Sequence, residues 1–317
     1  MLIIDEEFKK KHDFLGQCGL KKSTIDKRDY ALTYKNVQII IPDEFRLESP
    51  NITKDQGQTQ MCASFSSSYI AEHLNKLATG KYTELSPSFV YANRSNQDSD
   101  GMELRDAEKI LVNIGVCKNE LFNKIEIEPQ LNIDYNKSNP ENLIKDAANY
   151  KTLSFAQLNN SNDIKISLMT NGYVHIGVPW YSSNSLDYKI LSDTPGDYIA
   201  KLIQGDVKDL TGYHALILTG FSKKYNAWWC FNTWGDYGNN GLFLLPYDYP
   251  IDQSFAVMGK VKEPSDANVI KTIPSPIPSP IPSPIPNPVI KKKSKNELIQ
   301  WLWKVVNWFI NKFVNHK

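Results

Sequence analysis

The sequence has few cysteines, almost no net charge and no long apolar run near its N-terminus. Four cysteines occur among 317 residues, far apart, without a CxxC pair or a spacing typical of zinc sites. We therefore expect no disulfide framework, no metal centre and no cofactor, and free thiols favour a reducing compartment. A net charge of +1 gives no bulk attraction to nucleic acid, so a nucleic-acid partner is not expected.

The N-terminal residues are acidic and lack the apolar segment of a secretory signal, so no signal peptide is predicted. The length is sufficient for one large domain or two lobes, with residues left over for a tail.

Residues 55–66 contain a cysteine where a loop is predicted to become a helix. Gly57 and polar residues precede Cys62, and apolar residues follow it at helical spacing as far as a stop at Gly80. A thiol at a helix N-terminus is favoured as the nucleophilic thiolate. This stretch alone is equally compatible with a buried structural cysteine.

A second group of polar residues lies in a predicted β-region. His214 begins a short apolar strand, and the sequence Asn232–Gly235 follows a second strand. His175 is a rival for the role of base because it also follows Cys62. Only His214 is followed, eighteen positions later, by Asn-x-Trp-Gly.

These motifs resemble the papain family of cysteine peptidases. The matching sequences are Gln-Gly-x-x-x-x-Cys at 56–62, His-Ala at 214–215, Asn-Thr-Trp-Gly at 232–235 and Gly-Leu-Phe at 241–243. The resemblance covers about residues 25–262. It implies an α+β fold of two lobes, helical around the cysteine and β-barrel-like around the histidine and asparagine.

Two positions depart from the family pattern. Thr59 stands where secreted members have a disulfide cysteine, and Ala63 replaces the usual tryptophan. Members without that disulfide are found among bacterial, archaeal and viral proteins. The resemblance therefore favours an intracellular location or packaging in a virion.

The resemblance implies a thiol peptidase acting on polypeptides. Cys62 would be the nucleophile, His214 the base, and Asn232 the residue that orients the imidazole. Trp234 would shield the histidine–asparagine hydrogen bond from water. Gln56 and the backbone N–H of Cys62 would stabilise the oxyanion.

The sequence from Asp100 to Glu103 predicts a capping box for a second helix, with Asp100 as the N-cap. In papain relatives the loop before this helix lines the substrate cleft. Asp100 and Gly101 are therefore weak candidates for substrate contact, and capping is the preferred role for Asp100. Residues 181–210 are predicted to form a long loop at the mouth of the site.

Four segments are predicted. Residues 1–40 form an N-terminal arm or a short propeptide-like segment, and residues 41–262 form the peptidase domain. Residues 263–290 form a proline-rich linker in the polyproline II conformation, and residues 291–317 a basic, amphipathic helix.

The C-terminal helix is predicted to bind a membrane surface. Its apolar face is wide and contains three tryptophans, and lysines precede it, a combination suited to anionic lipid. A membrane-spanning helix and self-association are the alternatives. The polar residues form one narrow stripe: Gln300, Lys304, Asn307, Asn311 and Asn315.

Two other functions are compatible with the sequence. Ala63 and Thr59 would suit a catalytically silent papain-like binding module. Another Cys-His acyl hydrolase, such as a cell-wall amidase or a transglutaminase-like enzyme, is the second alternative. Gln56 and the sequence 232–235 argue against it.

Overall fold

The computed structural model describes residues 18–23, 30–34, 39–188 and 198–259. The chain divides into two units, residues 1–269 and residues 270–317. The second unit lies outside the described residues, as do the predicted linker and C-terminal helix. No helix in the described part of the chain is long and apolar enough to cross a membrane.

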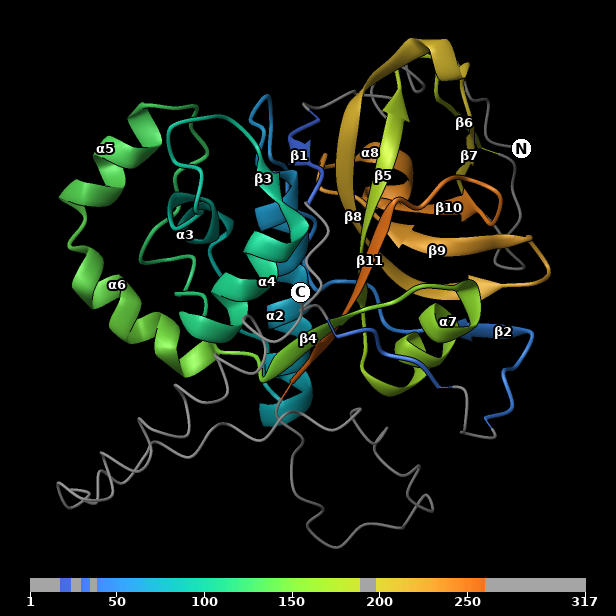
Figure 1. Ribbon diagram of the computed structural model, residues 1–317, viewed down its shortest axis with the longest axis horizontal. Coiled ribbons are helices and arrows are strands. Elements are labelled where there is room, and N and C mark those ends of the chain that lie inside the picture. Colours follow the sequence, from blue (N-terminus) through green and yellow to red (C-terminus); the bar gives the residue numbers. More distant parts are fainter. Residues whose placement is uncertain (1–17, 24–29, 35–38, 189–197, 260–317) are drawn as a thin grey trace, which may run out of the picture. The chain divides into compact units, whose positions relative to one another are not determined.

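Helices gather on the left of Figure 1 and form one lobe. The predicted end of one of them is confirmed. The central helix ends at Gly80, which is left-handed with a φ of 73°. Asn139 caps the last helix, because its side chain accepts the backbone N–H of Asn142. The helices are α2 (Cys62–Thr79), α3 (Pro87–Ala92), α4 (Leu104–Asn113), α5 (Gln130–Lys137) and α6 (Pro140–Ala147), followed by η1 (Ala148–Tyr150).

A nine-stranded sheet forms the other lobe, in the order β4-β11-β5-β8-β9-β10-β7-β6, with β2 also paired to β8 (Figure 1). Helix α7 (Ser161–Thr170) and the short α8 (Tyr237–Asn240) accompany it. The strands are β2 (Glu44–Arg46), β4 (Ser154–Gln157), β5 (Val174–Tyr181), β6 (Ser185–Asp187), β7 (Lys201–Ile203), β8 (Leu210–Ser222), β9 (Ala227–Phe231), β10 (Leu242–Pro246) and β11 (Gln253–Met258).

Helix α2 connects the two lobes. Its buried residues Phe65, Tyr69 and Ile70 belong to one apolar core with residues of the other helices. The same core includes Ala215 of β8 and Phe231 of β9. The first turn of α2 therefore lies where helices and sheet meet. The two-lobed α+β prediction is confirmed.

Two local predictions are wrong. Glu103, not Asp100, is the N-cap of α4, and no side chain caps that helix. Gly101 has a φ of 81°, and the next two residues are extended as β3 (Met102–Glu103). This strand pairs in parallel with β1 (Leu20–Lys21), so long-range pairing has replaced the capping box.

The region 181–210 is not one long loop. Within its described residues, β6 pairs antiparallel with β7, and η2 (Val207–Asp209) follows. Leu186 and Leu202 face each other in this pair and are both buried, which supplies an apolar contact.

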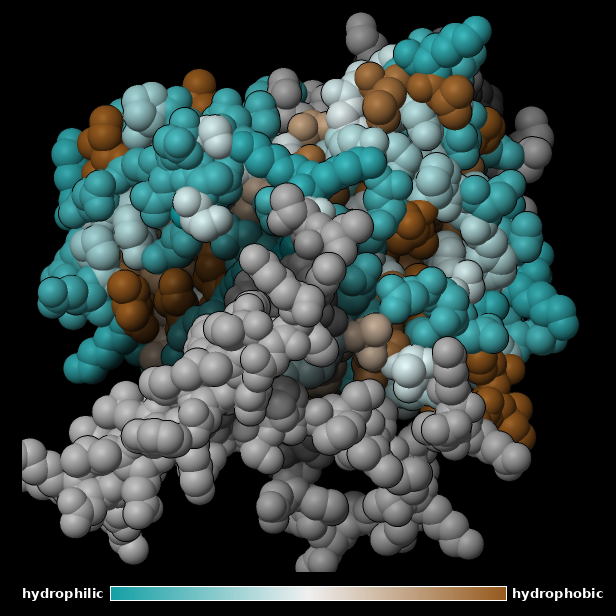
Figure 2. Space-filling view, in the orientation of Figure 1, coloured by the Kyte–Doolittle hydropathy of each residue, from teal (hydrophilic) through white to brown (hydrophobic). Residues whose placement is uncertain are grey.

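Figure 2 shows that hydrophilic residues cover most of one face of the described unit, with apolar residues scattered among them.

Candidate active site

Cys62 is the first residue of α2, as predicted, and its side chain is 0% exposed. Burial raises the pKa of its thiol to about 11, and hydrogen bonds from the backbone of Ala215 and Gly19 lower it only in part. The thiol is therefore protonated in this arrangement. The thiolate expected from the helix N-terminus is not present here, because desolvation outweighs the helix dipole.

His214 lies on β8, one residue before Ala215, and is hydrogen-bonded to Asn232. The distance from His214 Nε2 to Asn232 Oδ1 is 2.8 Å, and the backbone N–H of Thr233 donates to the same oxygen at 2.7 Å. An amide oxygen can only accept, so the proton of the neutral imidazole is on Nε2. His214 Nδ1 is then the basic nitrogen, and it is buried without a hydrogen-bond partner among the described residues.

The imidazole of His214 is neutral in this arrangement. Burial lowers its pKa to about 4, although the hydrogen bond to Asn232 acts in the opposite direction. The Cys62 thiol and the His214 imidazole are therefore both neutral in this arrangement. The closed surroundings are the cause, because neither charge has water to solvate it.

Two tryptophans enclose the histidine–asparagine pair. Trp234 stacks on the His214 ring with a centroid distance of 4.2 Å. Trp180 lies edge-on to both rings, 5.4 Å from His214 and 4.9 Å from Trp234. Both tryptophans are almost fully buried, so water is kept away from the hydrogen bond. The position of Trp180 was not predicted from the sequence.

Gln56 lies in the loop that precedes Cys62, and hydrogen bonds hold both its side chain and its backbone. Its Nε2 donates to the carbonyl of Thr59 at 2.7 Å, and its Oε1 accepts the hydroxyl of Thr233 at 2.6 Å. Its backbone N–H also donates to the carbonyl of Thr233, at 2.8 Å. Thr233 thus orients both Gln56 and Asn232. Sequence reasoning missed this role, although the residue lies inside the 232–235 motif.

Asp100 and Gly101 lie on the helical side of the same region. Asp100 is exposed and lines a pocket of about 170 Å³ together with residues 58–60 of the catalytic loop. Gly101 is buried, and a Cβ at this position would lie 2.5 Å from the carbonyl oxygen of Gly19. The chain therefore already occupies the backbone surface at Gly101.

The segment 18–23, hereafter the arm, covers the nucleophile. Gly19 accepts the backbone N–H of Met102 at 3.0 Å and lies against the backbone of Gln60. Leu20 is 7% exposed and belongs to the same apolar core as Cys62. The arm therefore forms part of the cover over the nucleophile.

His175, the rival base, serves another cluster. Its Nδ1 is 2.5 Å from Glu108 Oε1, and its Nε2 is 2.6 Å from Ser66 Oγ. All three side chains are fully buried. Both ring nitrogens are occupied, so His175 has none to offer the Cys62 thiol. The cluster joins α2, α4 and β5.

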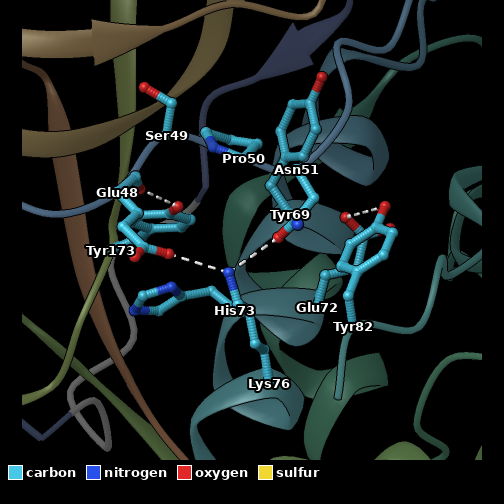
Figure 3. A pocket seen from close by; sticks show the side chains of 10 residues that line it. All are labelled: Glu48, Ser49, Pro50, Asn51, Tyr69, Glu72, His73, Lys76, Tyr82 and Tyr173. Carbon is cyan, nitrogen blue, oxygen red and sulfur yellow. Dashed lines mark hydrogen bonds and ion pairs between the residues drawn. The ribbon is translucent and has the colours of Figure 1, made fainter. Parts of the chain in front are cut away.

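His73 is one of the residues that line a separate pocket (Figure 3). The His73 ring stacks on Tyr173 at 3.9 Å, and burial lowers its pKa to about 4. Lys76 lies at one side of this pocket, where its Nζ donates hydrogen bonds to Glu48 and Asn51. The cavity of about 20 Å³ has room for one water molecule. Within the described residues, no three His, Cys, Asp or Glu side chains could hold a metal ion.

Comparisons with known proteins identify the family and the fold. The model of the family described as papain family cysteine protease matches residues 42–254. Xylellain, a cysteine protease from Xylella fastidiosa, superimposes with a TM-score of 0.64 at 21% identity, covering 77% of this chain and 96% of that one.

Two further solved structures share the fold. Procathepsin B S9 from Trypanosoma congolense has a TM-score of 0.56 at 16% identity, covering 77% of this chain and 87% of its own. Procathepsin L 3 from the larval midgut of Tenebrio molitor has a TM-score of 0.53 at 15% identity, covering 73% and 74%. No curated protein matches the sequence.

Proposed function

Because the chain belongs to the papain family of cysteine proteases, we propose that it hydrolyses peptide bonds through Cys62, His214 and Asn232. The observation that carries this proposal is the pair of hydrogen bonds to Asn232 Oδ1, from His214 and from the backbone of Thr233. These bonds support the proposal because an amide oxygen can only accept, so the imidazole proton would be on Nε2 and Nδ1 would accept the proton of the thiol.

The reaction would proceed in two steps. Nδ1 of His214 takes the proton of Cys62, the sulfur attacks the peptide carbonyl, and the protonated imidazole then protonates the leaving amine. Water, deprotonated by the same nitrogen, hydrolyses the thioester. Gln56 and the backbone N–H of Cys62 stabilise the oxyanion in both steps. No step uses a metal or a cofactor.

The arm controls access to this chemistry. A substrate needs the surface at Gly101 and Met102 that Gly19 and Leu20 occupy. Opening the cleft also lets water reach the thiol and the imidazole, which restores the conditions for an ion pair. The arm is thus the propeptide-like part of residues 1–40, and the closed arrangement is the latent form.

Labelling with a vinyl-sulfone thiol probe tests the function. We expect the probe to modify Cys62 and no other cysteine, and to abolish cleavage of a peptide library. Cys62→Ala should lose both labelling and cleavage, whereas the matched control Cys117→Ser should keep both. Labelling without cleavage would point to another acyl hydrolase. Absence of both in the whole chain and also in Gly19→Ala, which should release the arm, would point to a silent binding module.

The proposal also includes a tether. Residues 291–317, with their lysines, tryptophans and narrow polar stripe, would bind an anionic membrane surface at the end of the proline-rich linker. Flotation with anionic liposomes tests this with the whole chain and a chain ending at Lys262. Equal flotation of the two would contradict the tether. Carbonate-resistant binding would favour a spanning helix.

A further inference from the structure

The proposed reaction leaves one buried polar cluster unused. Ser66 of α2, His175 of β5 and Glu108 of α4 are all fully buried. In the sheet, His175 lies between its cross-strand neighbours Ile217 and Phe255, and both belong to the apolar core that contains the nucleophile. Buried polar groups cost free energy unless they are hydrogen-bonded, so three of them in an apolar core need an explanation.

The hydrogen bonds of the cluster run in one direction. The Ser66 hydroxyl donates to the carbonyl of Cys62 at 2.7 Å, with the carbonyl of Ala63 at 3.2 Å. A hydroxyl has one proton and a carbonyl has none, so Ser66 Oγ accepts at its contact of 2.6 Å with His175 Nε2. His175 Nδ1 and Glu108 Oε1, 2.5 Å apart, hold a second proton between them. The chain of hydrogen bonds therefore ends on the carbonyl of the nucleophile.

Serine, histidine and glutamate are also the residues of a hydrolase triad, but this cluster cannot act as one. The Ser66 hydroxyl donates to backbone carbonyls rather than to the histidine, which is the reverse of an activated nucleophile. It is also fully buried, so no substrate reaches it. The cluster therefore acts through its place in the fold.

The cluster joins the elements that carry the nucleophile and the base. Ser66 lies one turn after Cys62 on α2, so holding Ser66 also holds the first turn of that helix. His175 lies on β5, which pairs antiparallel with β8 and places Val178 opposite His214. A shift of α2 relative to the sheet would move the Cys62 sulfur with respect to His214, and the hydrogen bond to Ser66 resists such a shift.

Stability is a poor explanation for this arrangement. Replacing a buried ion pair by apolar side chains of similar volume is often neutral or stabilising. A buried polar network instead tolerates only positions in which every member keeps its partner. The cluster therefore favours one position of α2 against the sheet over neighbouring positions.

We propose that Ser66, His175 and Glu108 are positioning residues, which hold Cys62 at the distance from His214 that proton transfer needs. None of the three side chains contacts the reacting atoms. The role rests on the proposed function, because transfer of the thiol proton to the imidazole is the step that depends on this distance. A displacement of about 1 Å is enough to slow an enzymatic reaction roughly 10²-fold.

Two neighbouring serines test the role. Ser66→Ala removes the link between α2 and the sheet. The matched control Ser67→Ala removes an equally buried hydroxyl, which donates to the carbonyl of Ser64 within the same helix. Both changes are made in the full-length Gly19→Ala chain, so that the arm does not limit access to the thiol.

The assay measures labelling by the vinyl-sulfone probe at several probe concentrations. This separates the maximal labelling rate from the probe concentration that gives half of it. We expect Ser66→Ala to lower the maximal rate about 10-fold to 10²-fold at an unchanged half-saturating concentration, and Ser67→Ala to change neither. Equal maximal rates for the two would overturn the proposal.

A second pair of variants separates positioning from stability. His175→Gln and His175→Leu both leave Glu108 without its partner, so both should lose stability in thermal unfolding. Only glutamine keeps an N–H donor that can reach Ser66. The maximal labelling rate should therefore stay within a few-fold of the parent chain in His175→Gln and fall at least 10-fold in His175→Leu. A rate that follows the loss of Tm in both variants would make the cluster a structural element only.

The function and the positioning role fail in different ways. If neither the wild type nor Gly19→Ala reacts with the probe, the proposed activation of Cys62 is wrong and the positioning role falls with it. If Gly19→Ala reacts, and Ser66→Ala in that chain reacts at the same maximal rate, the function stands and the positioning role is wrong.

Discussion

Replacing Gly19 by alanine should expel the arm from the cleft. A Cβ at this position would overlap the carbonyl group of Gln60 and lie 2.5 Å from its Cα. Real Cβ atoms do not make such contacts with backbone, so either the arm or the catalytic loop must move. Gln60 is close to the start of α2, whereas the arm is held by a two-residue pairing and by polar contacts at the surface, such as Lys22 with Asp252. The arm should therefore move.

The size of the effect follows from the contacts that hold the arm. Burial of the Leu20 side chain contributes about 1.5–3 kcal/mol, and the hydrogen bond from Met102 to Gly19 about 0.5–1.5 kcal/mol. Their sum is about 2–4.5 kcal/mol, and about 1.4 kcal/mol corresponds to a tenfold change in population. The labelling rate of Cys62 should rise roughly 30-fold to 10³-fold in Gly19→Ala, with the higher value as an upper limit.

The assay follows labelling by the vinyl-sulfone probe with intact-mass spectrometry. The matched control is Gly80→Ala, because Gly80 has a φ of 73°, which makes a side chain costly, but nothing within 4 Å of its Cβ position. The control should lose stability and keep the wild-type labelling rate. If Gly19→Ala labels no faster than the wild type, the arm does not limit access to Cys62.

Three further results are expected. Thr233→Val should lower kcat about 10-fold to 10²-fold, because Gln56 loses the hydroxyl that orients it, while Thr233→Ser should remain near wild type; equal values for the two would remove this role. Acidification from pH 6.5 to 4 should raise the labelling rate of the wild type relative to Gly19→Ala. Burial lowers the pKa of His214 to about 4 in the closed form. Relative to the open form, the closed form therefore keeps its stability above pH 6.5 and loses about 3 kcal/mol as the pH falls toward 4. A constant ratio of the two labelling rates would contradict this. His175→Gln should lower Tm by roughly 6–20 °C, because Glu108 is left buried without its partner. It should leave unchanged the pH profile of cleavage, which is expected to be bell-shaped for a Cys–His pair, and loss of the acidic limb of that profile would make His175 the base.

Much of the fold follows from local signals. The apolar spacing after Cys62 and the glycine at 80 define α2, since side-chain burial and a left-handed stop act within a few residues. Asn139 and Pro140 begin α6 for a similar reason. Parts of the chain that depend on distant partners were not predictable in this way. From the sequence alone, residues 102–103 are predicted to lie at the start of a helix. In the structure they form a strand instead, because β1 pairs with them.

The candidate site also contains residues that local motifs predict and contacts that depend on distant parts of the chain. Cys62, His214, Asn232 and Gln56 were found because each occupies a fixed place in a motif, and the structure brings them to one region. The hydrogen bonds and ring contacts that hold these residues could not be predicted from the sequence. The two roles of Thr233 depend on a hydroxyl and a backbone N–H that point in different directions. The edge-on packing of Trp180 depends on how β5 lies beside β8.

The pKa values of the catalytic pair belong to the closed arrangement. A thiol at the start of a helix is favoured as thiolate when water and an imidazolium are near, which is the situation after the arm leaves. With Gly19 and Leu20 in place, burial dominates and both groups are neutral. Part of the cover over Cys62 is therefore supplied by a segment more than forty positions upstream. That segment has only a two-residue strand and a glycine that fits closely against Gln60, which is too little local pattern to predict.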